Sequence, residues 1–574
     1  MAAADAERGA VEEALPERLL VSVLAIGAVA VPYLLRGLDD SRLTSWSWVF
    51  GARSPAPLLA LAAAAALAAH AVARALPARR PELVLFLCAY GAGACFWGEP
   101  EPIVDAARYF VQAKHLELYG PLYFLREWGR AIPAWTDLPL VPFLHGVVLR
   151  LSGESRLALE AFSTLLFAAT AVLASRIARA LWDDEEAGFA AGALLLAMPY
   201  LLTQVPLALV DVPTMFFLAL AVHATLAAVR GGGTRRVLLA GAAAFLALAS
   251  KYSAWLLLGG LPLAALAAPR GRRRRALASV AAVAAVAAAL VLAAALPRLD
   301  VVARQASLLL GYQAPGLRRW GESFLSTFVF QVHPFVGAAA IASAWIALRR
   351  RDARWLVAAW PVLLLLALGV RRIRYLVPAF PMLAVLAAYG LQALRSREAR
   401  RVAVACAVLS SLAVGLHGYL PFLRGTSAAN LKDAGAHLDR VRADGVEVLT
   451  AYAGDPEVNP AVSVPILDLF TAKPLTYRDE GTPRPQGPRA ETSALRFTWE
   501  LPVAPFYAPR GAELEPVVAV ISDGAPLPAR VLERLRGYVL DRAFTAGDDP
   551  FQHATHVHVF VRSAPIAGAG AGGG

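Results

Sequence analysis

The sequence predicts a mainly α-helical integral membrane protein, a polytopic bundle of about thirteen transmembrane helices followed by a C-terminal α/β soluble domain. Composition is the first observation, because 58% of the 574 residues are hydrophobic and 17% are charged. Soluble domains average about 45–50% apolar and about 25% charged residues, and the mean hydropathy here is +0.54. The second observation is a series of apolar runs separated by short arginine clusters, and the third is the loss of the apolar bias after Pro421.

Each predicted span is an apolar run of about 15–25 residues, the length that crosses about 30 Å of hydrocarbon. The runs lie at 19–36, 57–77, 83–97, 158–180, 187–205, 208–229, 236–251, 253–269, 276–296, 334–349, 355–370, 375–394 and 402–422. They define a transmembrane domain at residues 19–422, preceded by a polar tail at residues 1–18. Acidic residues in this tail argue against a cleaved signal peptide, which begins with basic residues.

The arginine clusters predict the orientation of the bundle. With a cytoplasmic N-terminal tail, all five basic linkers lie on the cytoplasmic side, as the positive-inside rule requires. These linkers are Arg79–Arg80, Arg230–Arg236, Arg270–Arg275, Arg349–Arg354 and Arg395–Arg401. We therefore expect a multi-pass protein of the plasma (inner) membrane. The linkers also account for the net charge of +12, so nucleic acid is not an expected partner.

Three stretches on the opposite, outer side are longer than the few residues that a helix connection needs. They are the outer loop at residues 98–156, the segment Pro297–His333 and the chain after Pro421. The outer loop is rich in Trp, Tyr, Pro and charge, which predicts a site at the membrane surface, although its aromatic residues also fit an interfacial belt. The three cysteines lie in apolar stretches and provide neither a disulfide framework nor a thiolate metal site.

Beyond Pro421 the pattern predicts an extracytoplasmic α/β domain at residues 423–563. Helical stretches at 430–443 and 528–538 alternate with strands at 446–451, 517–522 and 556–562. His553, His556 and His558 suggest a metal site, but the last two occupy alternate positions of the terminal strand, and the strand interpretation is preferred. The Gly/Ala-rich residues 564–574 predict a disordered tail.

Charged side chains at membrane depth or at an outer helix end are costly, so each of them suggests a function. The candidates are Asp105 with Arg108 and Tyr109, Asp137, Asp211 at the start of the sixth span, Lys251 at the end of the seventh, and the outward-facing Arg371, Arg372 and Arg374 before Tyr375. Some have structural alternatives, since Asp137 and Asp211 also fit helix caps and Lys251 fits a side chain that extends to the interface. The arginines oppose the charge rule, and guanidinium groups suit phosphate.

Together these residues predict an outward-facing cavity with acids at one edge and cations at the other. A carboxylate there can take a proton from an incoming hydroxyl group, and the cations can hold a departing phosphate.

The order of these motifs resembles the polyprenyl-phosphate-sugar-dependent glycosyltransferases of the GT-C fold (glycosyltransferase family 39), which include protein O-mannosyltransferases and aminoarabinose transferases of lipid A. The resemblance covers about residues 85–420 and rests on Asp105 with Tyr109, on segments 138–144 and 152–155, on Asp211-Val212-Pro213, on segment 246–251, and on Arg374-Tyr375-Leu376-Val377-Pro378 with Pro381. The chain departs from the family at Ala106, where Glu is frequent, and at Asp137-Leu138-Pro139, where Lys-Pro-Pro is frequent.

The resemblance implies a GT-C bundle that transfers a sugar, with inversion, from a polyprenyl-phosphate donor to a lipid, glycan or protein acceptor at the outer face. Asp105 is then the expected base, Asp211 orients acceptor or sugar, and Asp137 is a further catalytic candidate. The expected donor-phosphate ligands are Lys251, Arg371, Arg372, Arg374 and Tyr375, and the expected substrate contacts are Arg108, Tyr109 and His145. No cofactor is required; a divalent metal is compatible with the site, but no protein metal ligands are expected.

Two other classes of function fit part of the pattern. A polytopic transporter or lipid flippase also has many spans and buried charges, but transporters usually contain internal repeats, and the long outer loop here occurs once. A catalytically inactive, sugar-binding member fits the absence of Glu after Asp105. Oligosaccharide ligation is a neighbouring reaction within the enzyme class.

Overall fold

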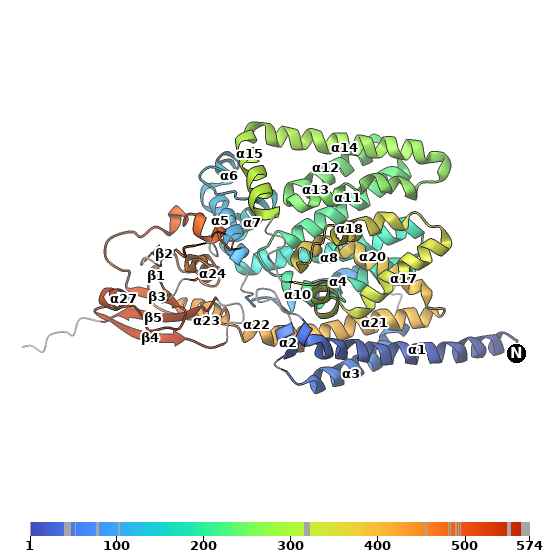
Figure 1. The fold of residues 1–574 in the computed structure, drawn as a ribbon, viewed down its shortest axis with the longest axis horizontal. Coiled ribbons are helices and arrows are strands. Elements are labelled where there is room, and N and C mark those ends of the chain that lie inside the picture. Colours follow the sequence, from blue (N-terminus) through green and yellow to red (C-terminus); the bar gives the residue numbers. More distant parts are fainter. Residues whose placement is uncertain are drawn as a thin grey trace, which may run out of the picture. The chain divides into compact units, whose positions relative to one another are not determined.

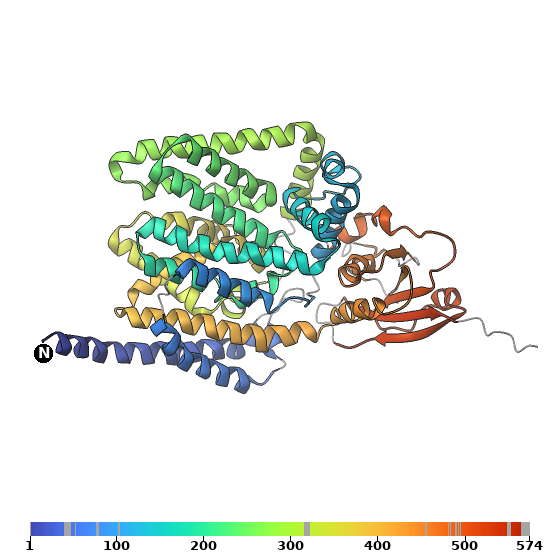
Figure 2. The same cartoon turned by 180° about the vertical axis from the view of Figure 1, so that it is seen from behind.

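The computed structural model describes residues 2–38, 47–51, 53–75, 80–100, 104–314, 322–453, 456–479, 482, 484–487, 491, 493, 495–547 and 553–563. The chain folds into two compact units (Figures 1 and 2). The membrane unit contains Met1–Trp97, His115–Leu151 and Leu157–Phe422, and the C-terminal unit contains Gly98–Lys114, Ser152–Arg156 and Leu423–Gly574. The predicted Gly/Ala tail lies outside the described residues.

The apolar runs of the membrane unit are helical, which confirms the predicted helical bundle. Its helices are α1 (Ala2–Leu35), α3 (Pro55–Ala75), α4 (Pro81–Ala94), α8 (Arg156–Trp182), α9 (Glu185–Leu194), α10 (Pro199–Gln204), α11 (Asp211–Gly231), α12 (Thr234–Ser250), α13 (Tyr252–Leu258), α14 (Arg273–Ala295), α17 (Pro334–Arg350), α18 (Trp355–Ala367), α20 (Phe380–Gly390) and α21 (Arg397–Val414). Among the described residues, seven helical stretches are long and apolar enough to cross a membrane.

The remaining predicted spans are shorter or interrupted helices. The run at 187–205 breaks between α9 and α10, where Pro199 begins the second piece and has no N–H to continue the first. The run at 253–269 starts as α13 and continues as the 3₁₀ turns of η2 (Leu261–Ala267). Lys251 separates α12 from α13 with an extended backbone.

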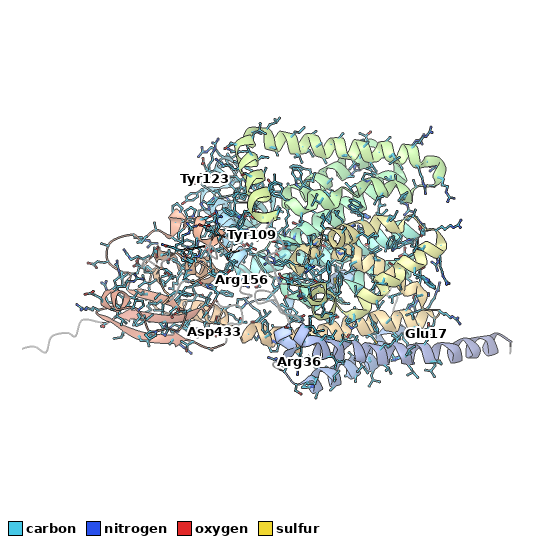
Figure 3. The ribbon with its side chains drawn as sticks, in the orientation of Figure 1. Glu17, Arg36, Tyr109, Tyr123, Arg156 and Asp433 are labelled. Carbon is cyan, nitrogen blue, oxygen red and sulfur yellow. The ribbon has the colours of Figure 1, made fainter. Side chains whose placement is uncertain are left out.

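The basic linkers that the structure describes lie at one end of the bundle (Figure 1). Arg230 donates a hydrogen bond of 3.1 Å to the carbonyl of Ala180, and Arg401 donates one of 3.0 Å to Glu186. Glu17 accepts from the backbone of Ser396 at 2.9 Å, and Figure 3 labels Glu17 and Arg36 towards opposite ends of the first span. Grouping of the linkers at one end is the geometry that the positive-inside interpretation requires.

At the other end, parts of two predicted outer stretches pack together. These parts are α6 (Pro121–Glu127), α7 (Leu140–Ser152) and α15 (Leu299–Leu308). Val301 of α15 shares an apolar cluster with Phe124, Trp128 and Ile132, and Arg298 donates to two carbonyls at the end of α6 at 2.6 Å. The outer stretches are therefore folded structure and not simple connections.

The C-terminal unit contains a five-stranded mixed sheet with the order β2-β1-β3-β5-β4. The strands are β1 (Val446–Ala451), β2 (Leu475–Arg478), β3 (Val517–Ser522), β4 (Tyr538–Phe544) and β5 (His556–Arg562). The pairs β1–β2 and β1–β3 are parallel, and β5 is antiparallel to β3 and β4. Apolar clusters cover both faces of the sheet, and α23 (Ala429–Leu438) contributes Leu431 and Leu438 to one of them.

The structure agrees with the predicted strands β1, β3 and β5 and adds two others. The helix predicted at 528–538 is too long, because the observed helix α27 spans only Ala529–Arg534 and Tyr538 begins β4. Most residues of β4 are exposed, so this edge strand lacks the alternating apolar pattern by which strands are recognised. His556 and His558 lie in β5, while His553 Nε2 lies 3.3 Å from Ser463 Oγ.

A buried ionic network holds the first half of α5 (Val104–Tyr119) within the C-terminal unit. Lys114 Nζ donates to Asp468 at 2.5 Å and to Glu154 at 2.7 Å, and the Tyr507 hydroxyl donates to Asp468 at 2.5 Å. Burial lowers the pKa of Lys114, but the two carboxylates outweigh burial and raise this pKa above its usual value. Burial and the Asp468 charge raise the pKa of Tyr507. The network therefore contains a charged lysine and a neutral phenol.

The Lys114 network predicts a large loss of stability when its cation is removed. Lys114→Met leaves the Asp468 charge buried without its ion pair, which typically costs about 3–5 kcal/mol. Thermal unfolding and limited proteolysis of the full-length protein measure the loss. The matched control is Arg536→Ala, which removes an exposed 3.6 Å pair with Glu533 and is expected to cost about 0–1 kcal/mol. Equal stability of the two variants would contradict a structural role of Lys114.

Candidate active site

Asp211 is the first residue of α11, and its side chain is 1% exposed. It does not act as a helix cap, because Val210 occupies the N-cap position and makes no side-chain capping bond. A carboxylate in the first turn benefits from the free backbone N–H groups of the helix, but full burial of a charge requires a closer partner.

Two cations provide this partner from distant parts of the chain. Lys251 Nζ donates to one carboxylate oxygen of Asp211 at 2.6 Å. Arg374 donates to the other oxygen through Nη2 at 3.0 Å and Nε at 3.3 Å. The Arg374 side chain is 4% exposed, whereas that of Lys251 is 16% exposed. Lys251 thus pairs with a carboxylate instead of extending to the interface.

An aromatic ring and further arginines extend this ion cluster. The Tyr375 ring lies 5.0 Å from Lys251 Nζ and 5.4 Å from the guanidinium carbon of Arg372, distances at which cations interact with an aromatic face. Arg371 is exposed, and its carbonyl accepts from Thr327 at 3.4 Å. The structure therefore brings together Lys251, Arg372, Arg374 and Tyr375 of the predicted donor-phosphate residues, and Arg371 precedes Arg372 in the chain.

Two polar residues near the cluster were not predicted from the sequence. Gln305 of α15 donates to the carbonyl of Asp137 at 2.6 Å and accepts from the Tyr252 hydroxyl at 2.7 Å. Buried Glu322 accepts from the backbone N–H of Ile373, next to Arg374, at 2.9 Å. Both lie in the stretch 297–333, which the sequence marks as unusually long. A single buried Gln or Glu in such a stretch has no motif around it that identifies it.

Asp137 lies near the cluster through Gln305, and it does not occupy the N-cap position of α7. Pro139 accepts the first helical hydrogen bond, from Phe143. His145 of α7 is fully buried, and neither ring nitrogen has a hydrogen-bond partner in the described part of the chain. Its ring packs edge to face on Phe162, with centroids 6.1 Å apart. His145 is therefore enclosed by protein in this conformation.

Asp105, Arg108 and Tyr109 belong to the C-terminal unit. Asp105 lies in the first turn of α5, and its carboxylate pairs with Arg108 Nη1 at 3.1 Å. The Arg108 guanidinium packs on the rings of Tyr109 and Phe497 at 5.0 and 4.6 Å. Figure 3 labels Tyr109 and also Arg156, which packs on Phe470 at 4.1 Å. The Asp105 side chain is 19% exposed, so it is far more accessible than Asp211.

Contacts place three cations, Lys251, Arg372 and Arg374, and two carboxylates, Asp211 and Glu322, at the ion cluster. Cations therefore outnumber carboxylates among these side chains. Arginine and lysine bind phosphate through charge-assisted hydrogen bonds. Within the described residues, no group of three or more His, Cys, Asp or Glu side chains is placed to hold a metal ion.

Comparisons with known proteins give one local family match. Residues 135–298 match the family model described as dolichyl-phosphate-mannose-protein mannosyltransferase, and this part of the chain contains Asp137, Asp211 and Lys251. No curated protein sequence matches the chain.

Solved structures show the same architecture. The crystal structure of ArnT from Cupriavidus metallidurans bound to undecaprenyl phosphate aligns with a TM-score of 0.52 and 13% identity, over 86% of this chain and 100% of that chain. The apo structure of the same protein aligns with a TM-score of 0.50 and 14% identity, over 84% of this chain and 99% of that chain.

The fold and the ion cluster define a polytopic membrane protein with the GT-C glycosyltransferase architecture, which confirms the resemblance predicted from the sequence. The chain is similar to the protein mannosyltransferase family over residues 135–298 and to ArnT over most of its length. The first match is local, and the second shows a shared fold.

A double-mutant cycle tests whether Asp211 and Arg374 act as one buried unit. Asp211→Asn leaves two cations without their counter-charge and is expected to cost about 3–5 kcal/mol of stability. Arg374→Gln costs less, because Lys251 still pairs with Asp211. The double variant is expected to lose less than the sum of the single losses, with a coupling of about 0.5–3 kcal/mol.

Unfolding free energies of the purified full-length variants measure this coupling. Arg371→Gln is the control, since the exposed Arg371 side chain is expected to contribute little to stability. Strictly additive losses for Asp211→Asn and Arg374→Gln would show that the two side chains are not coupled.

Proposed function

We propose that this protein transfers a sugar from a polyprenyl-phosphate carrier to a lipid, glycan or protein acceptor at the outer face of the membrane. The observation that carries the proposal is the cation-rich cluster around Asp211, built at the end of the bundle opposite the basic linkers. Cations at that end are unfavourable under the positive-inside rule. An anionic substrate that binds them would explain their presence. The related fold of ArnT, whose crystal structure holds undecaprenyl phosphate, supports a carrier of this kind.

Asp211 has a positioning role in this proposal. Its carboxylate is enclosed and accepts from both Lys251 and Arg374, so it cannot approach an acceptor hydroxyl group. It fixes the two cations instead. Lys251 retains some exposure and Arg371 is exposed, so these two side chains and Arg372 are proposed to bind the donor phosphate.

Asp105 is the proposed general base. Of the acids that the sequence singled out, Asp137 and Asp211 are buried, whereas Asp105 is partly exposed. In the proposed reaction Asp105 takes the proton of the acceptor hydroxyl while the acceptor oxygen forms a bond to the anomeric carbon. The bond from that carbon to the phosphate oxygen breaks, and the phosphate leaves with the electron pair and is neutralised by the cations. A single displacement of this kind inverts the anomeric configuration, and no metal is required because cationic side chains neutralise the phosphate.

The base assignment predicts a selective loss of transfer. Asp105→Asn is expected to insert and to bind the polyprenyl-phosphate sugar normally, while the transfer rate falls by about 10²–10⁴-fold, the usual value of general-base assistance. The assay incubates membranes containing the protein with radiolabelled polyprenyl-phosphate sugars and measures sugar moved to lipid or protein.

Asp137→Asn is the matched control, because it removes a carboxylate in the same outer loop that is not assigned proton transfer. Near-normal transfer by Asp105→Asn together with loss in Asp137→Asn would move the base to Asp137. Absence of transfer by the unmodified protein with every polyprenyl-phosphate sugar would reject the glycosyltransferase proposal.

Orientation in the membrane is tested by cysteine accessibility. In a variant whose three cysteines are replaced by alanine, Leu122→Cys and Gly511→Cys are expected to react with an impermeant maleimide in intact cells. Gly271→Cys in a basic linker is expected to react only after lysis. All three positions are exposed, so burial does not explain a difference. The reverse pattern would place the ion cluster on the cytoplasmic side.

A further inference from the structure

A polar cavity lies at the end of the membrane unit where the basic linkers gather. Its volume is about 440 Å³, and its wall is formed by Trp182, Asp184, Arg350–Asp352, Arg354, Tyr389 and Gln392. The rings of Trp182 and Tyr389 stack with centroids 4.4 Å apart and form one apolar wall. None of these residues takes part in the proposed transfer of sugar, so the cavity needs a separate explanation.

The two acids of this cavity are already engaged by protein groups. Asp352 accepts from Arg354 through both carboxylate oxygens at 2.8 Å and from the Tyr389 hydroxyl at 3.3 Å. Asp184 caps α9 by accepting from the backbone N–H groups of Glu186 and Ala187. Asp352 is therefore paired with Arg354, whereas Asp184 keeps its negative charge because its partners are neutral N–H groups. Among the described residues Asp184 makes no ion pair with the other arginines of the wall, which carries three arginines and two carboxylates.

Two arginines remain for a ligand. Arg350 interacts with the neutral side chain of Gln392 and lies 5.9 Å from the Tyr389 ring. The Arg351 guanidinium has no hydrogen-bond or ion-pair partner among the residues that the structure describes. Arg351 also adopts a left-handed backbone with a φ of 50° at the end of α17, a position where glycine is usual. Arg351 thus occupies a left-handed backbone position that favours glycine.

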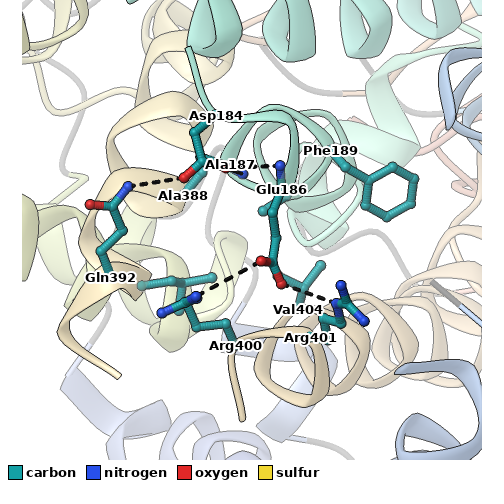
Figure 4. A pocket seen from close by; sticks show the side chains of 11 residues that line it. Asp184, Glu186, Ala187, Phe189, Ala388, Gln392, Arg400, Arg401 and Val404 are labelled. Atoms are coloured by element: carbon teal, nitrogen blue, oxygen red, sulfur yellow. Dashed lines mark hydrogen bonds and ion pairs between the residues drawn. The ribbon is translucent and has the colours of Figure 1, made fainter. Parts of the chain in front are cut away.

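An apolar groove adjoins this polar cavity and shares Asp184 and Gln392 with it (Figure 4). Phe189 and Ala190 of α9, Ala388 and Leu391, and Val404 of α21 line the groove. Arg400 and Arg401 lie at its rim, where they share Glu186 at 3.8 and 3.0 Å. Arg397 lies 3.6 Å from the same carboxylate, so this edge also carries more positive than negative charge.

From this juxtaposition we propose that the cavity and groove form a binding site for an anionic phospholipid, with the phosphate headgroup at Arg350 and Arg351 and an acyl chain along Phe189, Ala388 and Val404. The site joins a cationic, hydrogen-bonding compartment to an adjoining apolar groove, in the order in which a phospholipid presents its headgroup and the start of its chain. Basic pockets between helices on the cytoplasmic side bind anionic headgroups in this way. A soluble phosphate would use the arginines but not the groove.

Lipid binding is tested on the purified full-length protein without an activity assay, so the result does not depend on the proposed glycosyl transfer. Native mass spectrometry measures retention of phosphatidylglycerol against phosphatidylcholine, and thermal unfolding during titration of each lipid gives its apparent affinity. Wild-type protein is expected to retain phosphatidylglycerol preferentially. The double variant Arg350→Gln/Arg351→Gln is expected to bind phosphatidylglycerol roughly thirtyfold more weakly, from the usual contribution of two arginines to anionic-lipid binding.

Arg272→Gln/Arg274→Gln is the matched control, because it removes the same charge from another basic linker with exposed side chains and is expected to bind phosphatidylglycerol like the wild type. An equal loss in this control would reduce the effect to general attraction between basic linkers and anionic lipid, and it would overturn the site. Equal retention of both lipids would also overturn it. Stabilisation by inorganic phosphate to the same extent as by phosphatidylglycerol would assign the cavity to a soluble anion instead.

Discussion

The ion cluster of the membrane unit depends on one buried carboxylate. Asp211 begins α11, and its two oxygens accept from Lys251, at the break between α12 and α13, and from Arg374, in the short helix α19 (Ile373–Leu376). An isolated charge in apolar surroundings is strongly unfavourable, so these three segments are stable only when they meet. The contact fixes where α12 stops and where the chain before α20 turns, and it thereby positions the neighbouring Tyr375 and Arg372.

The same constraint separates structural charges from available ones. Both oxygens of the Asp211 carboxylate accept from cations, and Arg374 is nearly buried and belongs to the scaffold. Lys251 and Arg371 keep the exposure that the proposed phosphate site needs. At the opposite end of the bundle, other charged residues are likewise divided between internal ion pairs and a proposed ligand site. There Asp352 pairs with Arg354, Asp184 caps a helix, and the three arginines of the cavity wall outnumber its two carboxylates.

The C-terminal unit is not formed by residues 423 onward alone. Gly98–Lys114 and Ser152–Arg156 belong to it, and the buried contacts of Lys114 with Asp468 and Glu154 explain why. The helix that carries Asp105 is thus stabilised by residues more than 300 positions later in the chain. In the proposed mechanism, this makes the C-terminal unit a support for the segment that carries the base.

Hydrophobicity and charge patterning determined much of this protein without reference to a structure. Span-length apolar runs, arginine-rich linkers and strands of continuous apolar residues are local signals, so the helical bundle, the α/β domain and the strands β1, β3 and β5 follow from them. The cost of charge at membrane depth likewise identified Asp211, Lys251 and the three arginines at 371, 372 and 374 as candidates. Tertiary structure alone decided the partners. It showed that Asp211 is not a cap, that Gln305 and Glu322 join the cluster, that Asp105 folds with the C-terminal unit, and that exposed β4 replaces the end of a predicted helix. These outcomes depend on contacts between residues far apart in sequence. Such contacts produce no periodic pattern of residues from which they can be predicted.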